Sequence, residues 1–541
     1  MNRRRLIISF VLYTITFCWN TSLFSQIDST NLPLVIIDTG GQPIIDEPKI
    51  EAHLKIIYNE NSYSKKTDNP NIYDGHIGIE IRGRYSASLP QKPYGFETRD
   101  SLGNNRNVSL FHMPSENDWI LLANYNDKAF IRNSLAFELF RQMGHYAPRT
   151  QFCEVVVNGH YHGIYVLCEK IKVDKNRIDI AKLTDQENFG DDVTGGYVFK
   201  VDYYDDNNSW ESRYPPLGQN SKSVHFVYYY PEADKITYEQ KTYLQQFTDQ
   251  MESALYQSGS QGLVDIMSDY IDMNSFIDYF LINELARNVD GYKKSSYFYK
   301  DKNGKGGLLN AGPIWDFDWA WKNIDECFFG ATDGSGWAFS VHQCDIWPTP
   351  PSWTVKLMKD VRFVRMVKDR YIDLRQSILS ETYLFNYTDS VAALLDEAQQ
   401  RHYQRWPILG RNVGAPEVDA QPTTFEGEIT KFKNWISSRL NWLDIQFSSE
   451  IVTGLEDKPL IISENDTDCS IYPNPAFTCL SVKSEKSIFD FSLYSSNGER
   501  LKISYIPNTN TWDISSLPSG LYIVKNLFTD GSQWTGSFMK Q

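Results

Sequence analysis

The sequence predicts an α+β domain that is followed by a small all-β module. Strand patterns dominate up to about residue 230, and amphipathic helix patterns dominate between residues 237 and 447. Short strand patterns return towards the C-terminus, separated by turn signals such as Asn497-Gly498 and Asp530-Gly531. Because a chain of 541 residues is too long to fold around one ordinary hydrophobic core, we expect two or three domains.

The composition is that of a globular, acidic protein. Hydrophobic residues make up 41% of the chain and aromatic residues 14%, and the net charge is −15. No basic cluster follows residue 5. Because an acidic surface repels both nucleic-acid phosphates and anionic membranes, we expect no nucleic-acid partner.

Residues 1–25 have the parts of a secretory signal peptide. Arg3, Arg4 and Arg5 form a charged start, an apolar run follows at 6–18, and small residues precede Gln26. An N-terminal membrane anchor is the alternative interpretation. No later segment is long and apolar enough to cross a membrane, so we expect an exported mature chain without a transmembrane segment.

The cysteine count permits disulfides, because an even number remains after the predicted signal peptide. Cys327 and Cys344 would close one loop, and Cys469 and Cys479 form a local pair. The spacing leaves the connectivity open. No Cys-x-x-Cys or His–Cys spacing indicates zinc. The six cysteines are Cys153, Cys168, Cys327, Cys344, Cys469 and Cys479.

Three cations gather around one predicted strand–loop–strand unit. Residues 77–84 alternate apolar and polar side chains, and a further strand begins at residue 92. Arg82, Arg84 and Lys92 could therefore bind phosphate through charge-assisted hydrogen bonds. Solvated charges at a sheet edge are the alternative, since no Gly-x-Gly-x-x-Gly or Walker motif supports a standard phosphate loop.

Periodicity and turn signals predict the remaining elements. Asn158-Gly159 lies between two β-branched and aromatic runs and predicts a hairpin, and Asp272 predicts a helix cap. Further strands are expected at 32–38, 50–58, 119–123, 195–203 and 223–230. Helices are expected at 127–143, 237–255, 264–269, 272–287, 355–374, 388–403 and 424–447.

The stretch 288–321 contains the candidate site, because it carries aspartates at two places, which we call the two acidic points: Asp290 and the pair Asp316 and Asp318. A predicted hairpin, with strands at 296–300 and 308–314, would bring Asp290 near Asp316 and Asp318. Carboxylates gathered in this way suit a hard cation such as magnesium, and one carboxylate can act as a general base. Ordinary turn aspartates are the alternative interpretation.

The region 32–447 carries several motifs in order, each weak alone. They are Arg82-Gly-Arg with Lys92-Pro-Tyr, Trp119-Ile-Leu-Leu-Ala, Asn126-Asp-Lys with Arg132-Asn, Asn158-Gly-His-Tyr-His-Gly-Ile-Tyr-Val-Leu-Cys-Glu169, Asn288-Val-Asp290, and Gly312-Pro-Ile-Trp-Asp316-Phe-Asp318. With these motifs the region resembles the CotH (spore-coat protein H) family of atypical protein kinases. The resemblance implies a kinase-like fold, ATP with Mg²⁺ or Mn²⁺, and phosphorylation of protein Ser/Thr hydroxyls.

The resemblance also implies roles for individual residues. Asp290 matches the catalytic-loop aspartate that orients the substrate hydroxyl, and Asp316 matches a metal-binding aspartate, with Asp318 a second possible ligand. Ser295 stands where kinases usually place a metal-binding Asn. Arg82 or Lys92 would contact the phosphates, with Glu169 near the nucleotide.

Two other functions remain open beside kinase chemistry. One is a catalytically inactive, kinase-like structural, adhesion or glycan-binding surface protein, for which the aromatic segment 315–353 would be the candidate surface. The other is glycoside hydrolysis by paired carboxylates, which no family motif supports.

Residues 448–468 predict a linker, and a small module follows at 469–541. Its motifs are Ile471-Tyr-Pro-Asn-Pro-Ala476, Phe491-Ser-Leu-Tyr-Ser-Ser-Asn-Gly498, Trp512-Asp-Ile-Ser-Ser-Leu-Pro-Ser-Gly-Leu-Tyr-Ile-Val524 and Phe538-Met-Lys. With these motifs the module resembles the type A sorting domain of the type IX secretion system of Bacteroidetes. The resemblance implies an immunoglobulin-like sandwich, the type IX machinery as a partner, and a secreted or cell-surface protein that acts on a secreted or cell-surface protein substrate. An unrelated immunoglobulin-like binding module is the alternative.

Overall fold

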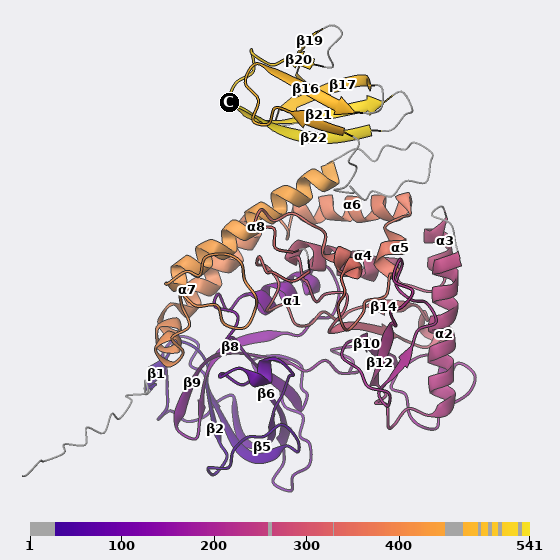
Figure 1. Cartoon of the computed structure of the whole chain (residues 1–541). Helices are drawn as coiled ribbons and strands as arrows, with labels where there is room; N and C mark the ends of the chain where they lie inside the picture. Colours follow the sequence, from indigo (N-terminus) through magenta and orange to yellow (C-terminus); the bar gives the residue numbers. More distant parts are fainter. Residues whose placement is uncertain are drawn as a thin grey trace, which may run out of the picture. The chain divides into compact units, whose positions relative to one another are not determined.

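The computed structural model divides the chain into two compact units, Met1–Glu456 and Asp457–Gln541 (Figure 1). It describes residues 27–257, 262–327, 329–448, 469–484, 488–495, 500–501, 503–506, 511–528 and 533–541. The predicted signal peptide at 1–25 therefore lies outside the described residues, as does nearly all of the predicted linker at 448–468.

A closed seven-stranded barrel forms the first part of the first unit. Its strands follow the order β2-β3-β5-β6-β7-β9-β8, and all pairs are antiparallel except β2 with β8. The strands are β2 (Leu34–Asp38), β3 (Ile50–Ile57), β5 (Tyr73–Ile81), β6 (Tyr94–Arg99), β7 (Asp118–Ala123), β8 (Thr150–Val157) and β9 (His160–Glu169). The small pair β1 (Ser29–Thr30) and β4 (Ser64–Lys65) lies outside the barrel sheet.

The apolar strand β7 is buried on both of its faces. Trp119 and Leu121 belong to the core inside the barrel, whereas Ile120 and Leu122 belong to the larger core that the helices cover. This explains why the strand lacks the polar alternation of a half-exposed strand. The hairpin predicted at Asn158-Gly159 is confirmed between β8 and β9, with φ of 49° and 81° at the two turn residues.

A five-stranded antiparallel sheet forms the second part of the first unit, in the order β11-β12-β10-β13-β14. The hairpin predicted after residue 295 is its β13–β14 pair, in which Phe298 lies opposite Ala311. The bounds are β10 (Tyr197–Val201), β11 (Ser209–Glu211), β12 (His225–Tyr230), β13 (Ser296–Lys300) and β14 (Leu309–Ala311).

Eight α-helices complete the described part of the first unit. Asp272 caps α4 as predicted, since its Oδ1 accepts the Ser275 N–H at 2.7 Å. The single helix predicted at 355–374 is wrong, because Asp360 caps a new helix there by accepting the Arg362 N–H at 2.7 Å. The helices are α1 (Arg132–Gln142), α2 (Tyr238–Gln257), α3 (Leu263–Met267), α4 (Met273–Ala286), α5 (Trp353–Leu357), α6 (Val361–Arg375), α7 (Glu381–Arg405) and α8 (Phe425–Ser448).

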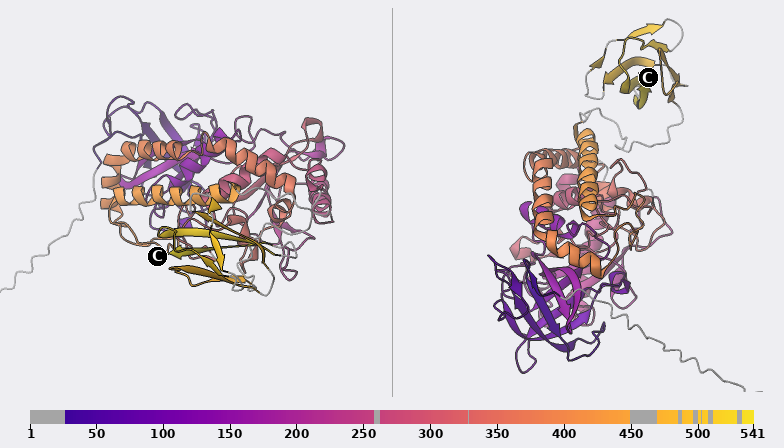
Figure 2. Two further views of the ribbon diagram at one scale, coloured as in Figure 1. Left: turned by 90° about the horizontal axis from the view of Figure 1, so that it is seen from above. Right: turned by 90° about the vertical axis from the view of Figure 1, so that its left-hand side faces the viewer.

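Helices α7 and α8 lie side by side (Figure 2), and α7 also fastens the barrel. Arg401 makes a bidentate ion pair with Glu154 on β8, at 2.6 and 3.0 Å. His402 Nδ1 accepts the Ile164 N–H at 3.1 Å. The approach depends on Gly163, which has φ of +101°, and a Cβ there would lie 2.7 Å from His402 Nδ1.

The second unit is all-β, as predicted, and has two four-stranded antiparallel sheets, β15-β16-β20-β19 and β18-β17-β21-β22. Residues from both sheets, among them Leu480 and Val524, share one apolar core. The immunoglobulin-like topology stays a prediction. The strands are β15 (Cys469–Tyr472), β16 (Cys479–Ser484), β17 (Ile488–Ser495), β18 (Arg500–Leu501), β19 (Ser504–Ile506), β20 (Thr511–Asp513), β21 (Gly520–Phe528) and β22 (Gln533–Lys540).

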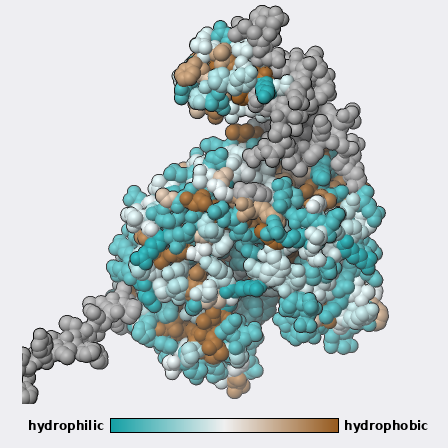
Figure 3. Space-filling view, in the orientation of Figure 1, coloured by the Kyte–Doolittle hydropathy of each residue, from teal (hydrophilic) through white to brown (hydrophobic). Residues whose placement is uncertain are grey.

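The helices and the surface can be compared with the prediction that the mature chain has no transmembrane segment. Over the part of the chain that the structure describes, none of the helices combines the length and apolar character that a membrane span requires. Hydrophilic residues cover most of the face shown in Figure 3, and hydrophobic residues gather there only in separate spots.

A buried ion pair joins α4 to α8 in the larger core. Glu284 and Arg439 are both fully buried, with Nη2 3.3 Å from Oε2. Glu284 also accepts the N–H groups of Ala338 and Phe339 at 2.7 and 2.8 Å and the Tyr292 hydroxyl at 3.0 Å. The glutamate side chain therefore accepts hydrogen bonds from several donors of the core at once.

Replacing Glu284 with alanine should lower the free energy of unfolding by about 3–5 kcal/mol, because it leaves the buried Arg439 guanidinium without its counter-charge and three further donors without their acceptor. Urea denaturation monitored by tryptophan fluorescence would measure this. Glu232→Ala is the matched control, since its ion pair with Lys235 is exposed, and it should cost less than about 1 kcal/mol. Equal losses in the two variants would contradict this account of the core.

Candidate functional site

The candidate site is built from the two ends of the β13–β14 hairpin. Helix α4 closes at Arg287, whose φ of 43° turns the chain out of the helix. The following turn starts at Asp290, whose carbonyl accepts the N–H groups of Lys293 and Lys294. The hairpin then returns the chain to Asp316. The sequence therefore delivers both acidic points to the same end of the hairpin.

A side-chain hydrogen bond joins these two ends directly. Ser295 Oγ donates to Asp316 Oδ2 at 2.7 Å. Both residues have left-handed backbone conformations, with φ of 47° at Ser295 and 59° at Asp316, which are unusual for residues other than glycine. Such conformations cluster at functional sites, where the surrounding structure holds them in place.

Asp316 and Asp318 lie two positions apart on one loop, and we call their surroundings the acidic recess. Asp318 is half-buried, whereas the Asp316 side chain keeps an exposed face although protein groups lie close to its carboxyl group. Limited hydration and the charge of Asp318 raise the pKa of Asp316, against the hydrogen bond from Ser295. Limited hydration also raises the pKa of Asp318, although Asn126 Nδ2 donates to its Oδ2 at 2.5 Å.

Residues at the start of α1 hold the loop that carries these carboxylates. Asn133 Oδ1 accepts the Phe317 N–H at 2.8 Å, and Arg132 Nε donates to the Ala320 carbonyl at 3.1 Å. Arg132 is itself buried and ion-paired with Asp127. The motif Asn126-Asp-Lys with Arg132-Asn therefore holds the loop that carries Asp316 and Asp318 in position.

Two lysines accompany Asp290, which is 18% exposed. Lys293 and Lys294 each place Nζ 3.1 Å from Asp290 Oδ1, and Lys293 also pairs with Glu326. Burial alone would lower the pKa of Lys294, but Asp290, Tyr203 and Glu326 together outweigh it and raise that pKa. Asp290 therefore lies in a locally cationic turn.

Arg82 lies beside the acidic recess. Its guanidinium carbon is 5.2 Å from the centre of the Trp315 ring, and its charge opposes the rise in the pKa of Asp316. Asp202, after β10, adds to that rise and pairs with Lys200 at 2.6 Å. The structure thus brings Arg82, predicted as a phosphate ligand, to the predicted metal ligands.

Lys92 and Glu169 make other contacts. Lys92 Nζ donates to the Ala87 carbonyl at 2.8 Å, within the loop that follows β5. Glu169 is fully buried at the end of β9, where Arg149 Nη1 lies 2.9 Å and Arg177 Nε 3.7 Å from its Oε1. Their predicted roles at the nucleotide stay predictions.

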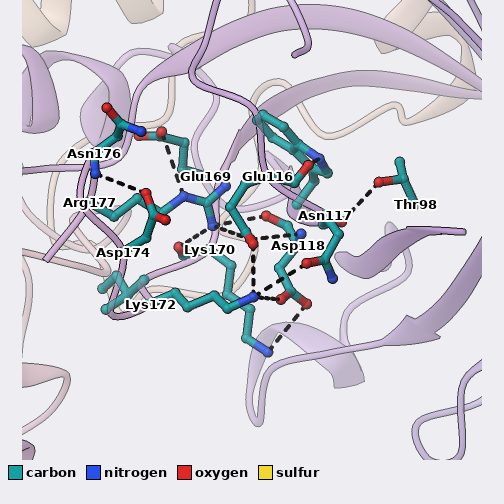
Figure 4. A network of polar contacts seen from close by, with 12 residues as sticks. Thr98, Glu116, Asn117, Asp118, Glu169, Lys170, Lys172, Asp174, Asn176 and Arg177 are labelled. Carbon is teal, nitrogen blue, oxygen red and sulfur yellow. Dashed lines mark hydrogen bonds and ion pairs between the residues drawn. The ribbon is translucent and has the colours of Figure 1, made fainter. Parts of the chain in front are cut away.

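Glu169 belongs to a polar network on the barrel (Figure 4). Arg177 is buried between acidic groups and donates to the carbonyls of Asp118 and Lys170 at 3.0 and 2.8 Å. Lys172 pairs with Glu116 at 2.9 Å and with Asp118 at 2.7 Å. These contacts fasten the segment after β9 to the start of β7.

A disulfide flanks the site. Cys327 and Cys344 are bonded and close the loop that the sequence permitted them to close, at a sequence separation of 17. Cys479, whose connectivity the sequence left open, has a free thiol and is not bonded to its local neighbour Cys469. Their strands explain this: in the β15–β16 ladder Cys469 lies opposite Ser484, at the other end of β16 from Cys479.

Most aromatic rings of the segment 315–353 belong to the core. Trp315, Trp321 and Trp353 are 7%, 0% and 3% exposed. Trp347 is 49% exposed, and it is the ring of this segment that stands out to solvent among the described residues. The segment therefore presents little of the aromatic surface that an adhesion or glycan-binding role would use.

The first unit is thus an α+β domain in which carboxylates and cations lie around one recess. Residues 79–443 match the model of the CotH kinase protein family, and the chain belongs to this family. It is also similar to the inner spore coat protein H of Bacillus subtilis (strain 168), with 24% identity over 204 residues. This match covers 37% of the chain and about half (49%) of that relative's length.

The second unit matches a separate family. Residues 470–540 match the model of the secretion system C-terminal sorting domain. This module indicates type IX secretion, and with it a secreted or cell-surface protein that engages the type IX machinery.

Sequence reasoning missed three residues around the recess. Asn126 lay in a quoted motif but was given no role, although it holds Asp318. Asp202 and Lys294 were not singled out. The available signal was Asn126, in the loop directly after the strand predicted at 119–123, because functional side chains concentrate in loops beside strand ends.

Loss of the disulfide should destabilise this part of the molecule. The Cys327→Ser/Cys344→Ser double variant should lose about 3 kcal/mol of unfolding free energy, as expected for opening a closed loop of similar length. Chemical denaturation of the oxidised protein would measure the difference. Cys479→Ser is the control and should change little; an unchanged double variant would contradict the expected constraint.

Proposed function

We propose that the first unit is a metal-dependent phosphotransferase that moves the γ-phosphate of ATP to Ser/Thr hydroxyls of secreted or cell-surface proteins. The observation that carries the proposal is the acidic recess. Its two carboxylates, Asp316 and Asp318, would be stabilised by a cation, and Ser295 connects Asp316 to the turn that begins at Asp290. Membership of the CotH kinase protein family supports the same reaction class.

The residues of the recess fit a Mg²⁺-type ion. Two neighbouring carboxylates with raised pKa are hard oxygen ligands that a divalent cation would neutralise. Within the described ranges no group of three or more His, Cys, Asp and Glu side chains has the arrangement of a metal site. Magnesium needs only one or two carboxylates, since phosphate oxygens and waters supply its other ligands.

Asp316 and Asp318 would hold the ion, with Ser295 in reach of the same carboxylate. When bound, such an ion neutralises the charge on the transferred phosphoryl group. Asn126 and Asn133 keep the carboxylate loop in position, so that binding does not need to reorganise it. Arg82 adds a positive charge beside the ion for the phosphates.

Asp290 would orient the acceptor hydroxyl and take its proton. As the hydroxyl oxygen forms its bond to the γ-phosphorus, the bond from that phosphorus to the β,γ-bridging oxygen breaks and ADP leaves. Lys293 and Lys294 hold the Asp290 carboxylate in one orientation before the acceptor arrives. Positioning of this kind supplies most of the catalysis in phosphoryl transfer.

Metal binding can be tested without any acceptor. Mg²⁺ or Mn²⁺ at 100 times its dissociation constant should add about 2.7 kcal/mol to the stability of the chain, measured as a rise in melting temperature. Asp316→Asn should abolish the rise, and Asn126→Ala should weaken metal affinity about 10–100-fold through the Asp318 carboxylate. Asp389→Asn, an exposed aspartate on α7, is the control. A rise that survives Asp316→Asn would refute the assignment of the recess.

Phosphoryl transfer can be tested separately with radiolabelled ATP and exported proteins as acceptors. Asp290→Asn should lower the transfer rate about 10²–10⁴-fold, because the amide cannot take the hydroxyl proton. Its metal-dependent rise in melting temperature should remain, since Asp290 is not assigned to the ion. Asp265→Asn, exposed on α3, should transfer at the native rate. Equal rates for Asp290→Asn and the native chain would exclude Asp290 as the base.

A further inference from the structure

A cluster of cations and aromatic rings lies beside the turn of Asp290. The Arg84 guanidinium carbon is 4.0 Å from the centre of the Tyr203 ring and 5.7 Å from that of Trp347. The two rings are 4.9 Å apart, and Tyr204 lies 5.6 Å from Trp347. We call Arg84, Tyr203, Tyr204 and Trp347 the cation–aromatic surface.

The cation–aromatic surface connects to Asp290 through one lysine. Lys294 Nζ lies 5.5 Å from the centre of the Tyr203 ring and 3.1 Å from Asp290 Oδ1. Tyr203 thus contacts both Arg84, from the loop after β5, and Lys294, from the turn after α4. A segment bound on this surface would therefore lie beside the proposed proton acceptor.

Arg84 has hydrogen-bonding capacity to spare. Among the residues that the structure describes, its guanidinium contacts rings and has no hydrogen-bond or ion-pair partner, and the side chain is exposed. A guanidinium that lies against a ring still presents the N–H donors at its edge. Two of these donors can bind the two oxygens of one carboxylate. The rings restrict its motion, so little further ordering is needed on binding.

The neighbouring carboxylates do not occupy this arginine. Asp202 is paired with Lys200 at 2.6 Å, and Asp345, two positions before Trp347, is paired with Lys222. Asp205 accepts the N–H of Asn207 at 2.8 Å within its own turn. Charge complementarity therefore favours an acidic ligand at Arg84, although the whole chain has a net charge of −15.

We propose that the cation–aromatic surface docks the acceptor polypeptide, and that Arg84 selects a segment with a carboxylate side chain close to the acceptor hydroxyl. Trp347 and Tyr203 supply the apolar contact area on which such a segment lies. This proposal rests on the proposed phosphotransferase function, because it assigns the substrate class of that same site.

Peptide binding tests the proposal without any chemistry. Two labelled synthetic peptides would each carry one serine, flanked by glutamates in the first and by glutamines in its twin, and fluorescence anisotropy with the full chain would give their affinities. The glutamate peptide should bind about tenfold more tightly, as expected for one charge-assisted bidentate contact. Equal affinities, or no measurable binding of either peptide, would overturn the proposal.

Variants assign the discrimination to Arg84. Arg84→Gln should make the two affinities equal, and Trp347→Ala should weaken both peptides while the ratio remains. Arg365→Gln, which removes an exposed arginine on α6, is the matched control and should keep the native ratio. A tenfold ratio that persists in Arg84→Gln would show that another group reads the acidic residue.

Two further arms separate the possible outcomes. A peptide in which phosphoserine replaces the glutamates identifies the anion, and binding tighter than that of the glutamate peptide would overturn the choice of a carboxylate. Phosphate transfer to the same peptides is measured independently. Discrimination without transfer would support the docking surface and contradict the phosphotransferase, whereas transfer without discrimination would contradict the docking surface alone.

Discussion

Two carboxylates in one recess are the constraint around which the first unit is organised. Limited hydration raises the pKa of both Asp316 and Asp318, and the charge of Asp318 adds to the rise at Asp316, so the two carboxylates need fixed hydrogen-bond donors or a cation. The fold supplies the donors from distant segments: Ser295 from the turn after α4, and Asn126 from the loop before α1. Left-handed backbone at both Ser295 and Asp316 is held by these contacts, which supports an arrangement kept for binding rather than for stability.

The parts that could be predicted from the sequence are local. A hairpin signal at Asn158-Gly159 and the helix cap at Asp272 each involve neighbours in the chain, and both are confirmed. Closure of the barrel could not be predicted, because it depends on the parallel pairing of β2 with β8, more than a hundred residues apart. The division between α5 and α6 was missed although Asp360 is a recognisable cap, because the apolar period continues across it.

The same distinction applies to the candidate site. The contact between Ser295 and Asp316 followed from the hairpin, because a hairpin brings the residues at its two ends together. The surroundings of Glu169 did not, since its partners Arg149 and Arg177 approach through tertiary packing. Arg82 and Lys92 illustrate the limit: they flank one loop, yet Arg82 faces the acidic recess and Lys92 donates to a backbone carbonyl in that loop.

The disulfide connects the two sides of the proposed reaction. Glu326, which pairs with Lys293 in the Asp290 turn, directly precedes Cys327. Trp347, which contacts Arg84 on the cation–aromatic surface, follows three positions after Cys344. The disulfide therefore restricts the loop between Glu326, which supports the turn of Asp290, and Trp347 of the cation–aromatic surface. A protein exported by type IX secretion works where such bonds persist, so the sorting module and the disulfide are consistent features of one design.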